Sequence, residues 1–299
     1  MRAQSLAAFC LLAAIWGTTW LAIKLVVREV PPLTAAGARF TLAALLLAAF
    51  SLWRGRSLRW KRFAAAERRL VLALALLMFT VPYALVFYGE QFISSALTAI
   101  LFSGGPVFTL FFDSLRVRRN LLTGERLLGL LLAFSGLLVI FVPRLAGPPG
   151  ELIGGVAIVV AAAVSSLALV LAKHGAHGID PLVGTTWQMG VGGPILLLIG
   201  VALERPALGG YSTLAMLALA YQVVFGSCVT FVTFYWLLKR MAAVQLSTLS
   251  FITPVVAVFV GWLVLGEVLG LGTLVGAGVI LLGLALLHRP APEALPAGD

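Results

Sequence analysis

The sequence predicts an all-α membrane protein with ten transmembrane helices, arranged as two inverted five-helix repeats around a central cavity. Hydrophobic residues make up 61% of the chain and charged residues 11%, and the mean hydropathy is +1.08. An ordinary soluble domain has about 25% charged residues, so this composition excludes a soluble fold. Apolar segments of spanning length follow one another along the chain, and several residues recur after 148 or 149 positions.

A helix needs about 20 mainly apolar residues to cross a bilayer, and ten segments of this chain meet that requirement. We expect them near residues 5–24, 32–53, 69–89, 93–113, 124–143, 151–173, 181–202, 212–238, 242–265 and 268–287. Only helices and closed barrels satisfy the backbone in lipid, and these runs are too long and too uniformly apolar for barrel strands.

The two halves of the chain carry matching residues at a nearly constant spacing. The matches are Lys24 with Lys173, Pro32 with Pro181 and Arg39 with Gln188, each 149 residues apart, and Pro106 with Pro254, 148 apart. Each half holds five expected spans, and because five is odd the second half starts on the opposite side of the membrane. Inverted repeats of this kind give alternating access around a midplane site in many secondary transporters. We therefore expect repeats over residues 1–144 and 150–289, followed by a disordered cytoplasmic tail over residues 290–299.

Basic residues fall mainly on one side of the expected bundle. Sixteen Lys and Arg residues lie on the side that carries both termini and the gaps after the second and fourth spans, and four lie on the other side. Cytoplasmic loops carry an excess of Lys and Arg. The sequence therefore predicts a multi-pass protein of a bacterial-type inner membrane with both termini in the cytoplasm. These short loops also explain the formal net charge of +10, and we expect no nucleic-acid partner.

The acidic residues, histidines and cysteines give no pattern typical of an enzyme or a metal site. All eleven acidic residues fall in gaps, tails or expected helix ends, whereas a proton relay usually needs a buried carboxylate. His174 and His177 have no third ligand nearby in the sequence. We therefore expect no metal, no cofactor, no catalytic residue and no strict requirement for a proton gradient. Besides a carrier, the alternatives are a passive uniporter or channel for small metabolites and, with less support, a membrane-embedded enzyme.

Arg39 is the strongly ionic residue inside an expected span. It lies seven residues after Pro32, roughly 10 Å below the membrane surface at 1.5 Å per residue, where a charge costs about 2.5–3.5 kcal/mol. One interpretation is a cavity-facing guanidinium that binds a substrate carboxylate. The other is structural: the side chain reaches the membrane surface, or it pairs with Glu90 or Glu267 near that surface. Its counterpart Gln188 is polar and uncharged.

Other polar and aromatic residues of the spans are candidates for lining the cavity. Aromatic stripes and prolines inside spans are also typical of plain packing and of helix bends, and both interpretations stay open. With Arg39 and Gln188, the candidate substrate-binding residues are Trp16, Thr19, Tyr83, Phe87, Thr98, Ser103, Thr230, Phe234, Tyr235, Ser247 and Ser250. The candidate hinges or kinks are Gly17, Pro82, Pro106 and Pro254.

Several short motifs occur in an order that is typical of one transporter family. They are Trp16-Gly17 in the first span, Ala38-Arg39-Phe40 in the second, and Pro254 followed by Gly266-Glu267 in the ninth. In this order and spacing the chain resembles the EamA-type, ten-helix branch of the drug/metabolite transporter superfamily over nearly its whole length. The first half departs from the pattern, because Arg119 stands where the family has a late Glu.

The resemblance implies a secondary transporter that exports small organic solutes, with amino-acid exporters of the YddG type among the similar proteins. The implied partners are a small-molecule substrate, such as an amino acid or a related metabolite, and the lipid bilayer. The sequence is compatible with a monomer or a homodimer. An Arg for a carboxylate and aromatic rings for a side chain add modest support to the amino-acid interpretation.

Overall fold

The structure is a computed structural model that describes residues 3–117, 124–207, 209–240 and 249–287. Within these residues all regular structure is helical. The first half contains α1 (Ala3–Val27), α2 (Pro32–Trp53), α3 (Ala65–Leu74), the π-helical turn η2 (Ala75–Thr80), α4 (Val81–Gly89), α5 (Ser95–Phe102), α6 (Gly105–Val117) and α7 (Gly124–Phe141). The second half contains α8 (Pro149–Gly175), α9 (Pro181–Glu204), α10 (Thr213–Val223), the π-helical turn η4 (Val224–Val229), α11 (Thr230–Leu238), α13 (Leu249–Leu265) and α14 (Leu271–Leu287). Short 3-10 turns cover Trp60–Arg62 and Val142–Ala146.

Eight helical stretches of the described residues are long and apolar enough to cross a membrane. They run over residues 4–27, 32–53, 65–89, 95–116, 124–146, 149–175, 181–204 and 213–238, and they coincide with the first eight expected spans. The ninth and tenth expected spans contain the shorter helices α13 and α14, of 17 residues each. The start of the ninth expected span, over residues 242–248, lies outside the described residues.

The chain runs back and forth between two ends of the bundle, which we call the α1–α2 end and the α2–α3 end. At the α1–α2 end, the carboxylate of Glu204, the last residue of α9, accepts a hydrogen bond of 2.8 Å from the Leu33 N–H at the start of α2. At the α2–α3 end, the Arg56 guanidinium lies 3.6 Å from the Asp180 carboxylate before α9. There, too, the Lys239 ammonium after α11 donates to the Ile179 carbonyl at 2.9 Å. These contacts fix which helix ends lie together.

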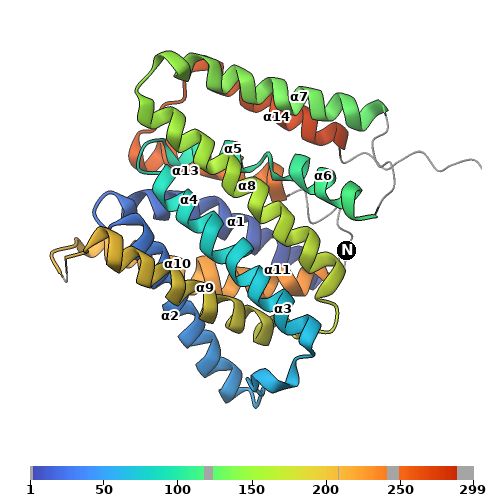
Figure 1. The fold of residues 1–299 in the computed structure, drawn as a ribbon. Helices are drawn as coiled ribbons and strands as arrows, with labels where there is room; N and C mark the ends of the chain where they lie inside the picture. Colours follow the sequence, from blue (N-terminus) through green and yellow to red (C-terminus); the bar gives the residue numbers. More distant parts are fainter. Residues whose placement is uncertain (1–2, 118–123, 208, 241–248, 288–299) are drawn as a thin grey trace, which may run out of the picture.

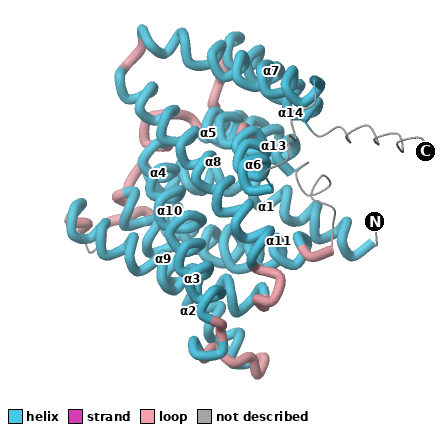
Figure 2. Tube along the Cα trace, turned by 45° about the vertical axis from the view of Figure 1, so that its right-hand side comes forward, coloured by secondary structure: helices cyan, strands magenta, loops and turns pink. Residues whose placement is uncertain are grey.

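Two close helix pairs flank the bundle. In Figure 1, α7 and α14 lie side by side along one edge of the molecule, and the turned view of Figure 2 shows the same pair. Glycines make this approach possible, because a Cβ at Gly136 would lie 2.6 Å from the Gly276 carbonyl oxygen. On α2 and α9 a Cβ at Gly37 would lie 2.2 Å from the Leu197 backbone nitrogen. Small residues at such contacts are typical of helix packing in membranes.

The expected spans 69–89 and 212–238 are not uniform α-helices, which is a correction to the sequence analysis. Each is interrupted by a six-residue π-helical turn, and the turns η2 and η4 begin 149 residues apart. Pro82 follows η2, and a proline removes a backbone donor from its helix. Phe231 occupies the corresponding position after η4, so proline alone does not cause these turns. π-helical turns often mark functional sites, and Met78 of η2 lines the central cavity.

Candidate substrate cavity

A cavity of about 410 Å³ lies between the two halves of the chain. Its walls come from α1, from η2 and α4, from α5 and α6, and from α8, α11 and α13. The start of α7 contributes Arg126 in addition. The volume falls in the usual range of small-molecule sites, about 300–1,000 Å³.

Several aromatic rings line the cavity wall. Trp16 lies 5.3 Å from Phe234 between ring centroids, and Trp20 lies 5.2 Å from Phe102. Hydroxyl groups are interspersed among them. The Ser166 hydroxyl donates to the Gly105 carbonyl at 2.8 Å, where the chain turns from α5 into α6. The wall is therefore largely apolar, with a few oriented polar groups, as is typical of a pocket for a small organic molecule.

Eight of the residues predicted to form or bend the site line this cavity: Trp16, Thr19, Pro82, Tyr83, Ser103, Pro106, Phe234 and Ser250. The lining does not include Arg39, Phe87, Thr98, Gln188, Thr230, Tyr235, Gly17 or Pro254. Ser247 lies outside the described residues. The structure thus brings together one set of the candidates and places the other set behind the wall.

Arg39 is fully buried behind the wall and is bonded to the π-helical turn η4. Its guanidinium donates to the Ser227 hydroxyl at 2.9 Å, to the Gln222 side-chain oxygen at 3.2 Å and to the Gly226 carbonyl at 2.7 Å. It also lies 4.9 Å from the centre of the Tyr83 ring. A π-helical turn leaves carbonyls without their usual partners, and Arg39 satisfies one of them. The guanidinium therefore connects α2 to the second half of the chain.

Most of the other candidates behind the wall have partners of their own. The Tyr235 hydroxyl donates to the Gln188 side-chain oxygen at 3.0 Å, between α11 and α9. The Thr98 hydroxyl donates to the Ser94 carbonyl at 3.0 Å, one turn earlier in the chain. Phe87 packs near the Arg39 guanidinium, 6.0 Å from its ring centre. Buried hydrogen bonds of this kind hold helices together.

The four candidate hinges occupy different kinds of position in the structure: some lie at helix junctions or inside helices, and one lies at a close contact between two helices. Pro106 stands at the start of α6, where α5 ends and the Ser103 hydroxyl donates to the Ile100 carbonyl at 2.7 Å. Pro254 lies within the continuous helix α13. Gly17 is a packing site, because a Cβ there would lie 2.5 Å from the Val256 side chain. In the sequence, a glycine in the middle of a span indicates that another helix can approach closely there.

A charged cluster at the α2–α3 end of the cavity was not foreseen. The Asp113 carboxylate accepts from the Lys173 ammonium at 2.9 Å and lies 2.7 Å from the His174 ring nitrogen. Asp113 and Lys173 line the cavity. The sequence analysis placed Asp113 at a helix end, but α6 continues to Val117, so the carboxylate lies about one turn inside the helix. No group of three or more potential metal ligands occurs in the described part of the chain.

The fold and the cavity define a multi-pass helical membrane protein built around a small-molecule pocket. A solved crystal structure aligns with 96% of this chain and 98% of its own at a TM-score of 0.67, and its 18% sequence identity makes this a likeness of fold alone. The EamA-like transporter family matches the sequence over residues 4–142 and again over residues 152–289. The chain belongs to the EamA-like transporter family and is a membrane transporter.

Several curated relatives are similar over most of their length. The uncharacterized transporter YoaV of Bacillus subtilis is 28% identical over 90% of this chain and 91% of its own. The uncharacterized inner membrane transporter YedA of Escherichia coli is 27% identical over 91% of this chain and 87% of its own. Protein PagO of Salmonella typhimurium is 27% identical over 84% and 81%, respectively.

Proposed function

We propose that this chain is a secondary transporter that exports small organic solutes, amino acids or related metabolites, by alternating access across a bacterial-type inner membrane. The observation that carries the proposal is a largely apolar cavity between the two halves. Its lining extends to Asp113 and Lys173 at the α2–α3 end, whereas the α1–α2 end is packed with buried residues. At the closed end, Val30 and Ile93 are 6% and 4% exposed. A cavity that reaches one side at a time is the arrangement of a carrier.

The proposed architecture is ten spans in two inverted repeats, over residues 1–144 and 150–289, with residues 290–299 as a cytoplasmic tail. Two separate matches to the family and two π-helical turns 149 residues apart support the repeat. We assign α13 and α14 as the ninth and tenth spans. Seventeen residues at 1.5 Å each extend about 25 Å, close to the hydrocarbon thickness of about 30 Å.

The proposed orientation follows from the basic residues. Arg54, Arg56, Arg59 and Lys61 lie in the α2–α3 connection, and cytoplasmic loops are rich in such residues. The α2–α3 end would then face the cytoplasm with both termini, and the α1–α2 end would face outward. The cavity would accordingly receive its substrate from the cytoplasm. The relative YedA of Escherichia coli, an uncharacterized inner membrane transporter, agrees with this location.

The proposed binding set is the group of candidates that line the cavity. Trp16, Tyr83 and Phe234 would contact an apolar side chain, and Thr19, Ser103 and Ser250 would offer hydrogen bonds. Asp113 and Lys173 would meet the charged ends of a zwitterion as it enters. Arg39, Gln188, Phe87, Thr98, Thr230 and Tyr235 would support the wall from behind.

Reconstitution in proteoliposomes tests the proposal. We expect an uptake screen over the twenty amino acids to yield at least one substrate, and unlabelled substrate on the opposite side to accelerate its entry. Trp16→Ala should lower the affinity at least tenfold, because a buried aromatic contact contributes about 1.5–3 kcal/mol. Trp262→Ala is the matched control, because Trp262 is 57% exposed on α13 and away from the cavity. Flux that substrate on the opposite side does not accelerate would indicate a channel instead.

A further inference from the structure

Glu90 has a buried carboxyl group for which the described part of the chain supplies no hydrogen-bond partner. It follows the last residue of α4 and has no exposed surface. Among the described residues, neither of its carboxylate oxygens has a hydrogen-bond partner. Native proteins rarely leave a buried polar atom unpaired, so such a group calls for a functional explanation. Glu90 is not part of the cavity lining, and the substrate cavity therefore does not supply that explanation.

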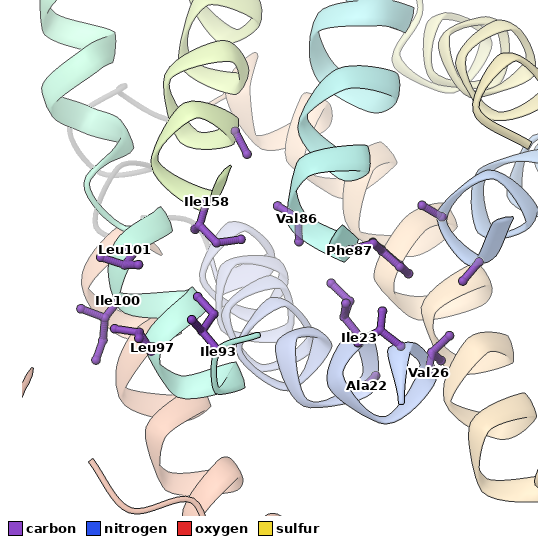
Figure 3. Close-up of a cluster of buried hydrophobic side chains, with 14 of the residues drawn as sticks. Ala22, Ile23, Val26, Val86, Phe87, Ile93, Leu97, Ile100, Leu101 and Ile158 are labelled. Atoms are coloured by element: carbon purple, nitrogen blue, oxygen red, sulfur yellow. The ribbon is translucent and has the colours of Figure 1, made fainter. Parts of the chain in front are cut away.

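The surroundings of Glu90 are mainly apolar. Figure 3 shows Val86 and Phe87 on the last turns of α4, facing Ile23 and Val26 of α1, with Ile93 on the connection to α5. All five side chains are buried. This packing closes the α1–α2 end of the bundle and keeps water away from the carboxyl group.

Four polar or charged groups face Glu90 from the elements around it. Lys24 of α1 directs its ammonium to the main-chain carbonyls of Glu90 and Ile93, at 2.5 and 2.7 Å. Glu267, from the α13–α14 connection, accepts from the Ser95 backbone N–H at 2.9 Å. Thr98 of α5 and Arg39 of α2 are the other two, and both use their donors elsewhere, as described above. From α8, the nearest residues to this turn are Gly154 and Ile158, which do not titrate.

The charge state of Glu90 must differ between a closed and an open α1–α2 end. Burial without hydrogen bonds disfavours an ionised carboxylate, and the Glu267 carboxylate opposes a second negative charge beside it. The Lys24 ammonium favours the ionised form, but its effect is smaller than that of burial. A neutral carboxyl group costs much less in the same place. When water reaches the carboxyl group, the free energy of ionisation returns to that of an ordinary hydrated carboxyl group. Closure therefore favours the protonated form, and hydration favours the ionised form.

We infer that Glu90 is a proton-binding site that controls the opening of the α1–α2 end. Glu90 takes up one proton as this end closes and releases it when the end opens and is hydrated. Both steps exchange the proton with the same side of the membrane, so no proton is carried across. Given the proposed orientation, on which this inference rests, external acid holds the transporter closed to the outside. Opening then becomes easier as the external pH rises.

The test measures opening without any substrate. In a chain with Cys10→Ala and Cys228→Ala, Val30→Cys places a thiol at the closed end, and Gly147→Cys places one in an exposed turn at the same end. Intact cells are treated with a membrane-impermeant maleimide between pH 5.5 and 8.5. The rate at position 30, divided by the rate at position 147, should rise with pH by up to about tenfold per unit, because one proton is linked to opening.

Substitutions at position 90 decide the inference. Glu90→Gln and Glu90→Met remove the proton equilibrium, and both should make the normalised rate independent of pH. Glu29→Gln is the matched control, because Glu29 is an exposed carboxylate at the same end, and its profile should follow that of the native residue. A pH profile unchanged in both Glu90 variants would overturn the inference. If position 147 reacts only in inverted vesicles, the proposed orientation fails, and the same ratio measured in those vesicles still tests Glu90.

Discussion

Equivalent residues of the two halves have different partners. Lys24 and Lys173 are 149 residues apart in the sequence, yet Lys24 lies at the closed α1–α2 end and Lys173 lines the cavity at the α2–α3 end. The Lys24 ammonium donates to main-chain carbonyls, whereas Lys173 pairs with Asp113. Arg39 is bonded to η4, while its counterpart Gln188 is bonded to Tyr235.

A repeat in the sequence therefore fixes the positions of these residues but not their partners. A partly buried lysine ammonium at a helix end donates hydrogen bonds to main-chain carbonyls or to a carboxylate. Which of these acceptors it has depends on the neighbouring chain segments. At the closed end the carbonyls of the α4–α5 connection reach Lys24. At the α2–α3 end the Asp113 carboxylate of α6 pairs with Lys173. The two halves are therefore not interchangeable, and each difference gives a test.

The largest expected effect comes from giving Arg39 the side chain of its counterpart. Arg39→Gln removes a guanidinium with three hydrogen bonds, and each buried partner left unpaired costs about 1–3 kcal/mol. We expect the midpoint of thermal unfolding in detergent to fall by several degrees, with equal loss of affinity for an amino acid and for its amide. Arg205→Gln, at an interhelical turn, is the control and should change neither quantity.

Arg39→Lys distinguishes a structural role of Arg39 from a role in binding a substrate carboxylate. Lysine keeps the charge but loses the planar fork, so a structural role predicts an intermediate loss of stability. If Arg39 bound a substrate carboxylate instead, the protein would keep its stability, and the acid would lose affinity while the amide would not.

The next effect concerns the charged pair at the α2–α3 end. Asp113→Asn leaves Lys173 without its carboxylate, and because the Lys173 side chain is 41% exposed, solvent screens part of the loss. We expect the rate of substrate exchange to fall roughly three- to tenfold, which corresponds to about 0.7–1.4 kcal/mol. The double variant Asp113→Lys with Lys173→Asp should recover part of the rate. Failure of the reversed pair to recover any activity would mean that the pair does not act by holding the two helices together and that the position of each charge matters, as contact with a zwitterion requires.

A smaller effect is expected from collapsing the proton gradient. Glu90 lies off the cavity wall, and among the described residues the acidic side chain on that wall is Asp113, which is paired. Exchange of substrate between loaded proteoliposomes and medium should persist when a protonophore is added. Complete loss of exchange would reveal a proton-carrying group inside the transport path, and Glu90 and Asp113 would be the first residues to substitute.

The smallest effect concerns acid at the exposed cap of α10. The Ser212 side chain and backbone both donate to the Glu29 carboxylate, at 2.6 Å each. These bonds hold the pKa of Glu29 below its ordinary value of 4.5. A depressed pKa contributes stability above the unfolded value, and that contribution is lost as the pH falls through the folded pKa. Hydrogen exchange of the backbone amides of residues 213–215 should therefore accelerate when the pH falls below the pKa of Glu29 in the folded protein. Ser212→Ala should abolish this acceleration.

The sequence predicted the helices well because each span must satisfy its own backbone in lipid. It also named Trp16, Tyr83 and Phe234 as candidates for a cavity, and all three lie on the cavity wall of the structure. Their role in binding stays a prediction. The π-helical turns η2 and η4 were missed, since hydropathy does not distinguish one helical hydrogen-bond pattern from another.

The sequence could not decide the neighbours of individual polar groups. Arg39 looked equally suited to a substrate or to a structural partner, and its hydrogen bonds to Ser227 and Gly226 depend on how α2 approaches η4. Asp113 seemed to lie at a helix end because the extent of α6 was underestimated. Glu90 seemed to lie at the surface, and only the packing of Val26, Phe87 and Ile93 shows that it is buried.

Alternating access itself can be measured with two pairs of spin labels. One pair, at Leu214 on α10 and Val268 between α13 and α14, spans the α1–α2 end, and the other, at Leu115 on α6 and Arg240 after α11, spans the α2–α3 end. Distances are compared with and without the amino acid identified in the uptake screen. We predict opposite shifts, in which the first distance increases as the second decreases. Two distances that increase together, or that both stay unchanged during confirmed transport, would contradict alternating access.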